Sequence, residues 1–154
     1  MPILYIMCGM PGCGKSTWAR NFIREHEDVR YVSRDEIRFT LVGEEEDYFA
    51  NENKVFQYFT DAIRETLVDG FDVIADATHL NRASRKKLIR ALHDVDFKII
   101  YVIFNTPYNV CLERNNAREG RCKVPEEAMA SMWRRYIEPT TDEDYRCIGV
   151  IEGE

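Results

Sequence analysis

The residues from Gly9 to Thr17 have the types and the spacing needed to hold the phosphates of a nucleotide. They match the pattern G-x-x-x-x-G-K-[ST], in which glycines let backbone amides come close to the phosphates. An apolar run precedes this segment and a helical pattern follows it, so the amides and the helix N-terminus form an anion site. Lys15 would place its charge at the β- and γ-phosphates, and the Ser16 hydroxyl would bind Mg²⁺. The predicted nucleotide-binding residues are Gly9, Gly12, Cys13, Gly14, Lys15, Ser16 and Thr17.

A carboxylate and an arginine follow the second predicted strand, at Asp35 and Arg38. Because the two positions are three apart on a helix, their side chains share a face. The carboxylate can orient an acceptor hydroxyl and take its proton, and the guanidinium can hold an acceptor phosphate with two hydrogen bonds. The alternative is a structural role, in which Asp35 favours the helix N-terminus and pairs with a surface arginine.

Another carboxylate, Asp76, ends the third predicted strand. It stands at a Walker-B-like position, where a carboxylate can act on Mg²⁺, on its waters or on the acceptor. We therefore expect Mg²⁺ on Ser16, with Asp35 or Asp76 contributing through water.

The residues after Asp76 offer further polar contacts. Thr78 and Asn81 are expected to hydrogen-bond the substrate, although Asn81 is also a natural helix N-cap that needs no substrate. His79 is expected to be a loop residue. The three histidines have no H-x-x-x-H spacing, so they predict no metal site of their own.

Two arginines, Arg114 and Arg118, are spaced four residues apart and present their guanidinium groups on one face. On a mobile lid covering about 114–125, they would close over a triphosphate and stabilise the charge of the transition state. The alternative is a solvated basic helix end, which the helix dipole favours at a C-terminus.

Strand and helix patterns alternate along the chain, which predicts an α/β protein with a five-stranded parallel sheet and helices on both faces. The run from Phe97 to Phe104 is the most hydrophobic and is expected to be the central strand. Because chemistry gathers at the carboxyl ends of parallel strands, the groups above should meet at one edge. Strands are expected at 3–8, 29–32, 71–76, 97–104 and 147–151, and helices at 15–26, 33–43, 49–69, 81–95, 106–119 and 125–137.

Polar residues are expected to begin several of these helices. Ser33 and Glu36 have the spacing of a capping box, and Thr106 before Pro107 is typical of an N-cap and a first helical turn. The acidic run at 44–47 is expected to be a solvated loop.

Length and composition predict a single domain over 1–154, with 45% hydrophobic residues and 31% charged residues. Five scattered cysteines without a C-x-x-C pair predict reduced thiols and a cytoplasmic protein. Neither a transmembrane nor a secretory segment is expected, so no membrane partner is predicted.

The net charge of −6 argues against attraction of nucleic acid by the whole surface. A local basic patch remains open, because one predicted helix is rich in Lys and Arg and could follow a strand backbone. The alternative is a solvated helix face. The basic residues of this helix are Arg82, Arg85, Lys86, Lys87 and Arg90.

The chain has no N-K-x-D motif that reads guanine, which argues against a GTPase. Its length argues against a motor or an AAA-type machine. A small phosphotransferase remains, and such an enzyme must align an acceptor, neutralise phosphate charge and exclude water.

The chain resembles the phage-type 5′-polynucleotide kinases, which belong to the wider P-loop kinase group that includes zeta-type toxins. The motifs cover nearly the whole chain in the family's order. The phosphate loop is generic, whereas the pair S-R-D-x-x-R and D-x-T-x-x-N is more specific. The resemblance is carried by G-M-P-G-C-G-K-S-T-W-A-R at 9–20, S-R-D-E-I-R at 33–38, D-A-T-H-L-N at 76–81, R-N-N-A-R-E-G at 114–120 and V-P-E-E at 124–127.

On the donor side, the resemblance implies a P-loop kinase-like three-layer sandwich that uses ATP and Mg²⁺. Lys15 and Ser16 would bind the phosphates and the metal. Arg118 would be the lid arginine on the donor phosphates, and Arg114 would lie near the adenine.

On the acceptor side, the resemblance implies that Asp35 is the general base for the 5′-hydroxyl of RNA or DNA. Arg38 would contact the acceptor's 3′-phosphate, and Asp76 with its neighbours would line the acceptor pocket. Because related repair enzymes carry a phosphatase or ligase beside the kinase, such an activity is expected on a separate partner protein.

Two other functions remain open. One is a small-molecule kinase on the same scaffold, with a nucleoside, a sugar or a nucleotide sugar as acceptor. The other is a nucleotide-dependent binding module that hydrolyses slowly and signals through its lid. The acceptor base Asp35 favours an enzyme.

Overall fold

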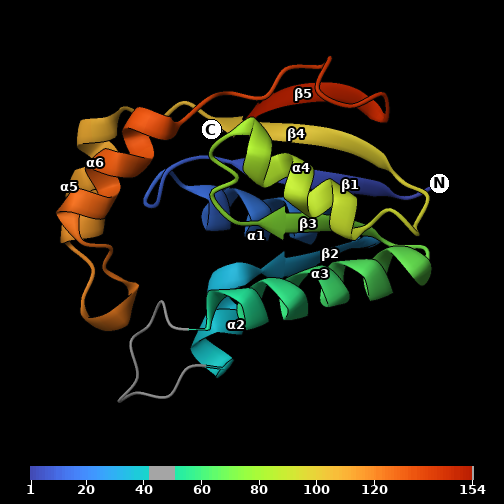
Figure 1. Cartoon of the computed structure of the whole chain (residues 1–154), viewed down its shortest axis with the longest axis horizontal. Coiled ribbons are helices and arrows are strands. Elements are labelled where there is room, and N and C mark those ends of the chain that lie inside the picture. Colours follow the sequence, from blue (N-terminus) through green and yellow to red (C-terminus); the bar gives the residue numbers. More distant parts are fainter. Residues whose placement is uncertain (42–50, 154) are drawn as a thin grey trace.

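The computed structural model describes residues 1–41 and 51–153, apart from the side chain of Arg121. Its five strands form one parallel sheet in the order β2-β3-β1-β4-β5 (Figure 1). The strands are β1 Ile3–Cys8, β2 Val29–Ser33, β3 Asp72–Asp76, β4 Lys98–Phe104 and β5 Cys147–Gly153. The helices are α1 Lys15–Glu25, α2 Arg34–Leu41, α3 Glu52–Val68, α4 Arg82–Ala91, α5 Tyr108–Asn116 and α6 Glu126–Arg135, with a 3₁₀ turn at Gly120–Cys122.

The middle strand is β1, because Leu4 is in register with Val73 of β3 on one side and with Ile99 of β4 on the other. Successive side chains of a strand point to opposite faces, so Leu4 and Tyr5 enter different cores. α3 and α4 close the first core, while α1, α5 and α6 close the second. The predicted three-layer α/β arrangement is confirmed.

The predicted elements are all present within the described residues, but several boundaries differ. β4 lies inside the sheet between β1 and β5, so it is not the central strand that its hydrophobicity predicted. The helix predicted at 81–95 ends at Ala91, and the one predicted to continue to 119 ends at Asn116. The predicted end of α2 near Gly43 and the acidic loop at 44–47 lie outside the described residues.

The Ser33 hydroxyl accepts a hydrogen bond from the Glu36 amide at 3.2 Å, as a cap should. Within the described residues, none of the helices has the length and apolar character needed to cross a membrane. All five cysteines are free thiols.

Candidate active site

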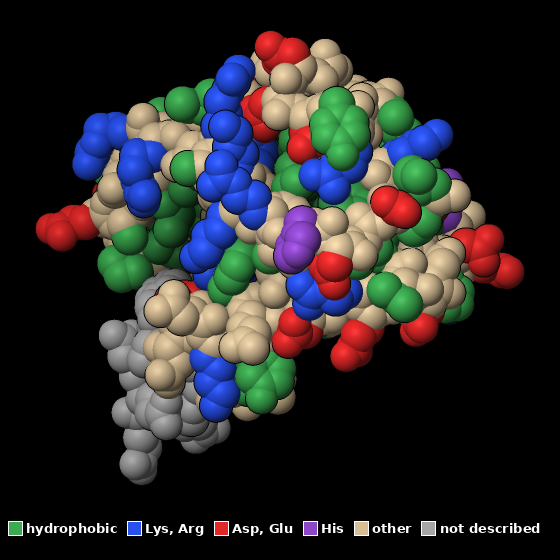
Figure 2. Space-filling view, turned by 45° about the vertical axis from the view of Figure 1, so that its right-hand side comes forward, with side chains coloured by type: hydrophobic (Ala, Val, Ile, Leu, Met, Phe, Trp, Pro, Cys, Tyr) green, Lys and Arg blue, Asp and Glu red, His purple; other side chains and the backbone are tan. Residues whose placement is uncertain are grey.

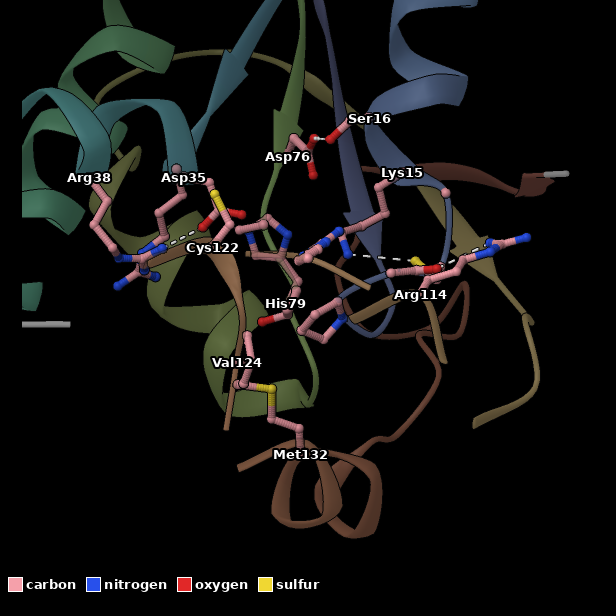
Figure 3. Close-up of a pocket in the computed structure, with 18 of the residues that line it drawn as sticks. Lys15, Ser16, Asp35, Arg38, Asp76, His79, Arg114, Cys122, Val124 and Met132 are labelled. Atoms are coloured by element: carbon pink, nitrogen blue, oxygen red, sulfur yellow. Dashed lines mark hydrogen bonds and ion pairs between the residues drawn. The ribbon is translucent and has the colours of Figure 1, made fainter. Parts of the chain in front are cut away.

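A cleft of about 810 Å³ opens at the carboxyl edge of the sheet, where the phosphate loop faces the starts of α2 and α3 (Figure 3). Most of the predicted site residues meet there, because their segments follow the ends of β1, β2 and β3. Gly9 and Asn81 do not line the cleft. The predicted residues that do are Gly12, Cys13, Gly14, Lys15, Ser16, Thr17, Asp35, Arg38, Asp76, Thr78, Arg114 and Arg118.

The phosphate loop needs glycine at Gly9 and Gly12 for different reasons. Gly12 has a φ of 83°, and a Cβ there would lie 2.7 Å from the carbonyl oxygen of Cys111. Gly9 makes a close approach instead, since a Cβ would lie 2.6 Å from the Cys13 sulfur. Glycine at position 9 therefore lets the Cys13 side chain pack closely against the start of the loop.

The Lys15 ammonium is turned into its own loop. Its Nζ donates to the carbonyls of Gly9 at 3.1 Å and Met10 at 2.9 Å. It also donates to the Cys13 sulfur at 3.5 Å, the contact drawn in Figure 3. A bound nucleotide would compete with these acceptors for the three N–H groups.

Ser16 and Asp76 lie together, as a shared metal site requires. The Ser16 hydroxyl donates to Asp76 Oδ2 at 3.0 Å, and the Tyr31 hydroxyl donates to the same oxygen. Burial, followed by the nearby charge of Asp76, raises the pKa of Tyr31, which stays a donor. Sequence reasoning missed Tyr31, which is an ordinary aromatic residue in a strand.

These oxygen atoms fit the ligand chemistry of Mg²⁺, which prefers oxygen ligands and keeps several waters. The described part of the chain has no group of three or more His, Cys, Asp and Glu side chains that could hold a metal by itself.

The side of the cleft formed by α2 and the start of α3 holds an ion-pair network around Arg38. This side chain is buried, and its Nη1 donates to Asp35. Its Nε and Nη2 donate to the two carboxylate oxygens of Glu52 at 2.9 and 3.1 Å, and Arg34 adds a third bond to Glu52 at 3.2 Å. The pairing of Asp35 with Arg38 was foreseen, but Arg38 is not a surface arginine. Asp35 keeps 70% of its side chain exposed and is open to a ligand.

Glu52 is a site residue that the sequence analysis missed. It stands in the first turn of α3, where an acidic residue needs no explanation beyond the helix dipole. Only the packing of α3 against α2 brings it to Arg38.

The loop between β3 and α4 is held by hydrogen bonds to α4, to β1 and to the start of the phosphate loop. Asn81 caps α4, because its side chain accepts from the Ser84 amide at 2.9 Å and Ser84 returns the contact. Asn81 therefore acts as the helix N-cap, the role that needs no substrate. His79 is buried, with its Nδ1 2.7 Å from the Met7 carbonyl, and Thr78 accepts from the Gly9 amide at 3.0 Å.

Arg85 is fully buried, so it does not belong to the exposed basic face of α4. Its Nε and Nη2 donate to both oxygens of Glu143 at 2.8 and 2.7 Å, and its Nη1 donates to the His79 carbonyl at 2.8 Å. The pair ties the segment before β5 to α4, and the third bond ties α4 to the loop that follows Asp76.

The arginines of the predicted lid lie at the mouth of the cleft. Arg114 Nη1 donates to the Gly12 carbonyl at 3.1 Å, and Arg118 is exposed. The buried Asn115 side chain donates to the Val124 carbonyl at 2.7 Å and accepts from its amide at 3.0 Å. These two bonds join the two ends of the segment from Asn115 to Val124.

Thr106 does not cap α5, because Pro107 takes the cap position without a side-chain bond. Instead its hydroxyl donates to the Cys13 carbonyl at 2.8 Å and supports the phosphate loop. The local sequence favours Thr106 as an N-cap, but its hydroxyl bonds to the Cys13 carbonyl instead.

A family model described as an AAA domain, AAA_33, matches residues 4–139. The chain belongs to the AAA_33 family. The predicted P-loop kinase-like identity and α/β fold of this AAA_33 chain are confirmed. The argument from length against an AAA-type machine stays a prediction.

A curated relative of the AAA_33 chain is the L-seryl-tRNA(Sec) kinase of Methanococcus maripaludis. It is 28% identical over 145 residues, which are 90% of this chain and 54% of the relative. The chain thus spans about half the length of the curated relative it matches.

Two solved structures extend the comparison. A chain of the Pnkp1/Rnl/Hen1 RNA repair complex is 26% identical, with a TM-score of 0.73 over 87% of this chain and 43% of that chain. Kti12 of Chaetomium thermophilum, solved with ADP-AlF3, is 18% identical, with a TM-score of 0.72 over 96% of this chain and 88% of that chain. At that identity, the likeness to Kti12 concerns the fold alone.

Proposed function

We propose that this P-loop kinase transfers the γ-phosphate of ATP to the 5′-hydroxyl of a polynucleotide. The observation that carries the proposal is the position of Asp35, an exposed carboxylate in the same cleft as Lys15 and Ser16. A neighbour from an RNA repair complex supports an RNA acceptor. The relative named as an L-seryl-tRNA(Sec) kinase has a substrate that contains RNA.

The donor phosphates would lie on the loop from Gly12 to Thr17. Lys15 would leave its carbonyl partners for the β- and γ-phosphates, and Arg118 would approach the γ-phosphate as 114–125 closes. Mg²⁺ on Ser16, with Asp76 acting directly or through water, would neutralise phosphate charge.

On the acceptor side, Asp35 would accept the proton of the attacking hydroxyl. Arg38 positions that carboxylate through their ion pair, because its own side chain is held by Glu52. An acceptor phosphate would have to share Arg38 with these two carboxylates.

The network also favours a second candidate, a small-molecule kinase. An acceptor without a phosphate leaves the bonds between Arg38, Asp35 and Glu52 intact, so it meets no competition from Glu52. A nucleoside or a sugar fits this description.

We expect Asp35→Asn to lower transfer from ATP to a 5′-hydroxyl RNA 12-mer at least about a hundredfold, since the amide cannot accept the proton. ATP affinity should stay within about threefold, because the donor loop is untouched. The measurements are γ-label transfer and nucleotide titration of the same preparations.

The matched control is Glu36→Gln, which removes an exposed carboxylate from the next position. It should transfer label at the native rate. If Asp35→Asn keeps more than about a tenth of the native rate, Asp35 is not the general base.

A further inference from the structure

The outer face of α4 carries a row of basic side chains that neither the donor site nor Asp35 uses. Arg82, Lys86 and Arg90 are exposed and four residues apart, so they lie along one side of the helix. The helix has no acidic residue, although the net charge of the chain is −6. Like charges at this spacing repel each other, and a cation in the first turn opposes the helix dipole. The row therefore costs stability unless an anion lies on it.

The chain supplies little counter-charge to this row. Within the described residues, Lys86 and Arg90 form no ion pair with a carboxylate. Arg82 approaches Glu143 at 3.7 Å, but that carboxylate is buried and holds Arg85 at 2.7 Å. The charges of Lys86 and Arg90 are consequently available to a ligand, while Arg82 shares Glu143 with Arg85 and donates to the Thr140 hydroxyl at 3.4 Å.

The row is continuous with the acceptor side of the cleft through Lys87. This residue lines the cleft, and its Nζ lies 4.3 Å from the centre of the Phe56 ring. The guanidinium of Arg34 approaches the same ring at 5.5 Å. Lys87 is three residues from Arg90 on the same helix, so the positive charge runs without a break from the cleft onto the outer face.

The space-filling view shows how this charge is distributed. Lys and Arg side chains gather in a band down one side of the face shown in Figure 2, while acidic side chains dominate its opposite lower edge. From Arg82 to Arg90 the helix rises by about 12 Å, which is room for more than one phosphate of an extended strand. A narrow row of charges matches a linear polyanion better than it matches a flat anionic surface.

We propose that Arg82, Lys86 and Arg90 bind backbone phosphates of a single-stranded polynucleotide acceptor after it leaves the cleft at Lys87. The inference rests on the proposed function, since it assigns a path to that acceptor. The contacts are to phosphates and carry no sequence preference. They matter for a long acceptor and not for a single nucleotide.

The test compares the double variant Lys86→Glu/Arg90→Glu with the native chain. Fluorescence anisotropy measures binding of a 5′-hydroxyl RNA 12-mer labelled at its 3′ end, over a range of salt concentrations. Label transfer is measured in parallel with the 12-mer and with a nucleoside 3′-monophosphate.

We expect the double variant to weaken 12-mer binding at least about tenfold and to lower the salt slope, since two phosphate contacts are lost. The KM for ATP and the transfer to the nucleoside 3′-monophosphate should not change. The control Arg24→Glu/Lys98→Glu makes the same change in net charge at two other exposed positions. It should bind the 12-mer as the native chain does.

Binding that is unchanged in the double variant, or weakened equally in the control, would overturn the inference. If the double variant also transferred label to the 12-mer at the native rate, the proposed function would be retained and only the path along α4 would be rejected. If the native chain instead bound the 12-mer through Lys86 and Arg90 but transferred no label to it, that result would contradict the proposed function and retain α4 as a nucleic-acid-binding surface.

Discussion

His79 joins the end of β1 to the loop that follows β3. It is buried with a φ of 43°, and its Nδ1 must carry a proton to donate to the Met7 carbonyl. Burial lowers its pKa to about 4, against the effect of this hydrogen bond and with help from the charges of Arg34, Lys15 and Arg85. The ring is therefore neutral at pH 7, and the folded chain resists its protonation.

This shift predicts a loss of stability in mild acid. Between pH 6.5 and about 4 the unfolded chain binds a proton at His79 and the folded chain does not, so unfolding is favoured as the pH falls. From pH 7 to 4.5, the free energy of unfolding should fall by about 2 kcal/mol more in the native chain than in His79→Asn. Asparagine suits the comparison because it tolerates a positive φ. Urea denaturation at both pH values gives the result, and an equal fall in both proteins would contradict it.

α4 has basic residues in two different environments, buried and exposed, and its sequence alone does not show which residue is in which. Arg85 and Lys86 are adjacent basic residues, yet Arg85 is fully buried against Glu143 and Lys86 is exposed. The bidentate pair holds the segment before β5, and the third bond of Arg85 holds the His79 carbonyl. The position of the β3–α4 loop therefore depends on a segment near the end of the described chain.

We expect Glu143→Ala to lower the free energy of unfolding by about 3–5 kcal/mol, because Arg85 would remain buried and charged without a carboxylate partner. Asp142→Ala, at an exposed neighbouring position, should cost less than about 1 kcal/mol. The double variant Arg85→Met/Glu143→Leu should recover part of the loss, since it removes both charges. Urea denaturation measures all three, and a Glu143→Ala chain as stable as Asp142→Ala would show that the pair stabilises nothing.

The strands and the phosphate loop were predictable because their signals are local. Parallel strands are buried on both faces and appear as apolar runs, and the loop has a fixed spacing of Gly9, Gly14 and Lys15. The partners of Arg38 and Arg85 were not predictable. Glu52 and Glu143 lie in unremarkable acidic contexts, and only tertiary packing selects them from 27 acidic residues.

At the scale of the whole molecule, one edge of the sheet gathers every group that the proposed reaction needs. The order β2-β3-β1 places the ends of three strands side by side, so Asp35, Asp76 and Lys15 reach one cleft although they are far apart in the sequence. α4 continues from this edge with its exposed basic face, while the net charge of the chain remains negative. The architecture thus places the phosphate loop on one side of the cleft and α2, α3 and α4 on the other, which are the donor and acceptor sides of the proposed reaction.

The most direct test of the central claim is label transfer from γ-labelled ATP with Mg²⁺ to a set of matched acceptors. The set contains a 5′-hydroxyl RNA 12-mer, the same 12-mer with a 5′-phosphate, the DNA equivalents, a nucleoside 3′-monophosphate, a free nucleoside and a sugar. We predict label on the 5′-hydroxyl oligonucleotides and the 3′-monophosphate, none on the 5′-phosphorylated strands, and at least about a tenfold loss in Arg38→Ala. Label confined to the nucleoside or the sugar would contradict the polynucleotide acceptor, and release of free phosphate without any labelled acceptor would contradict the kinase reaction itself.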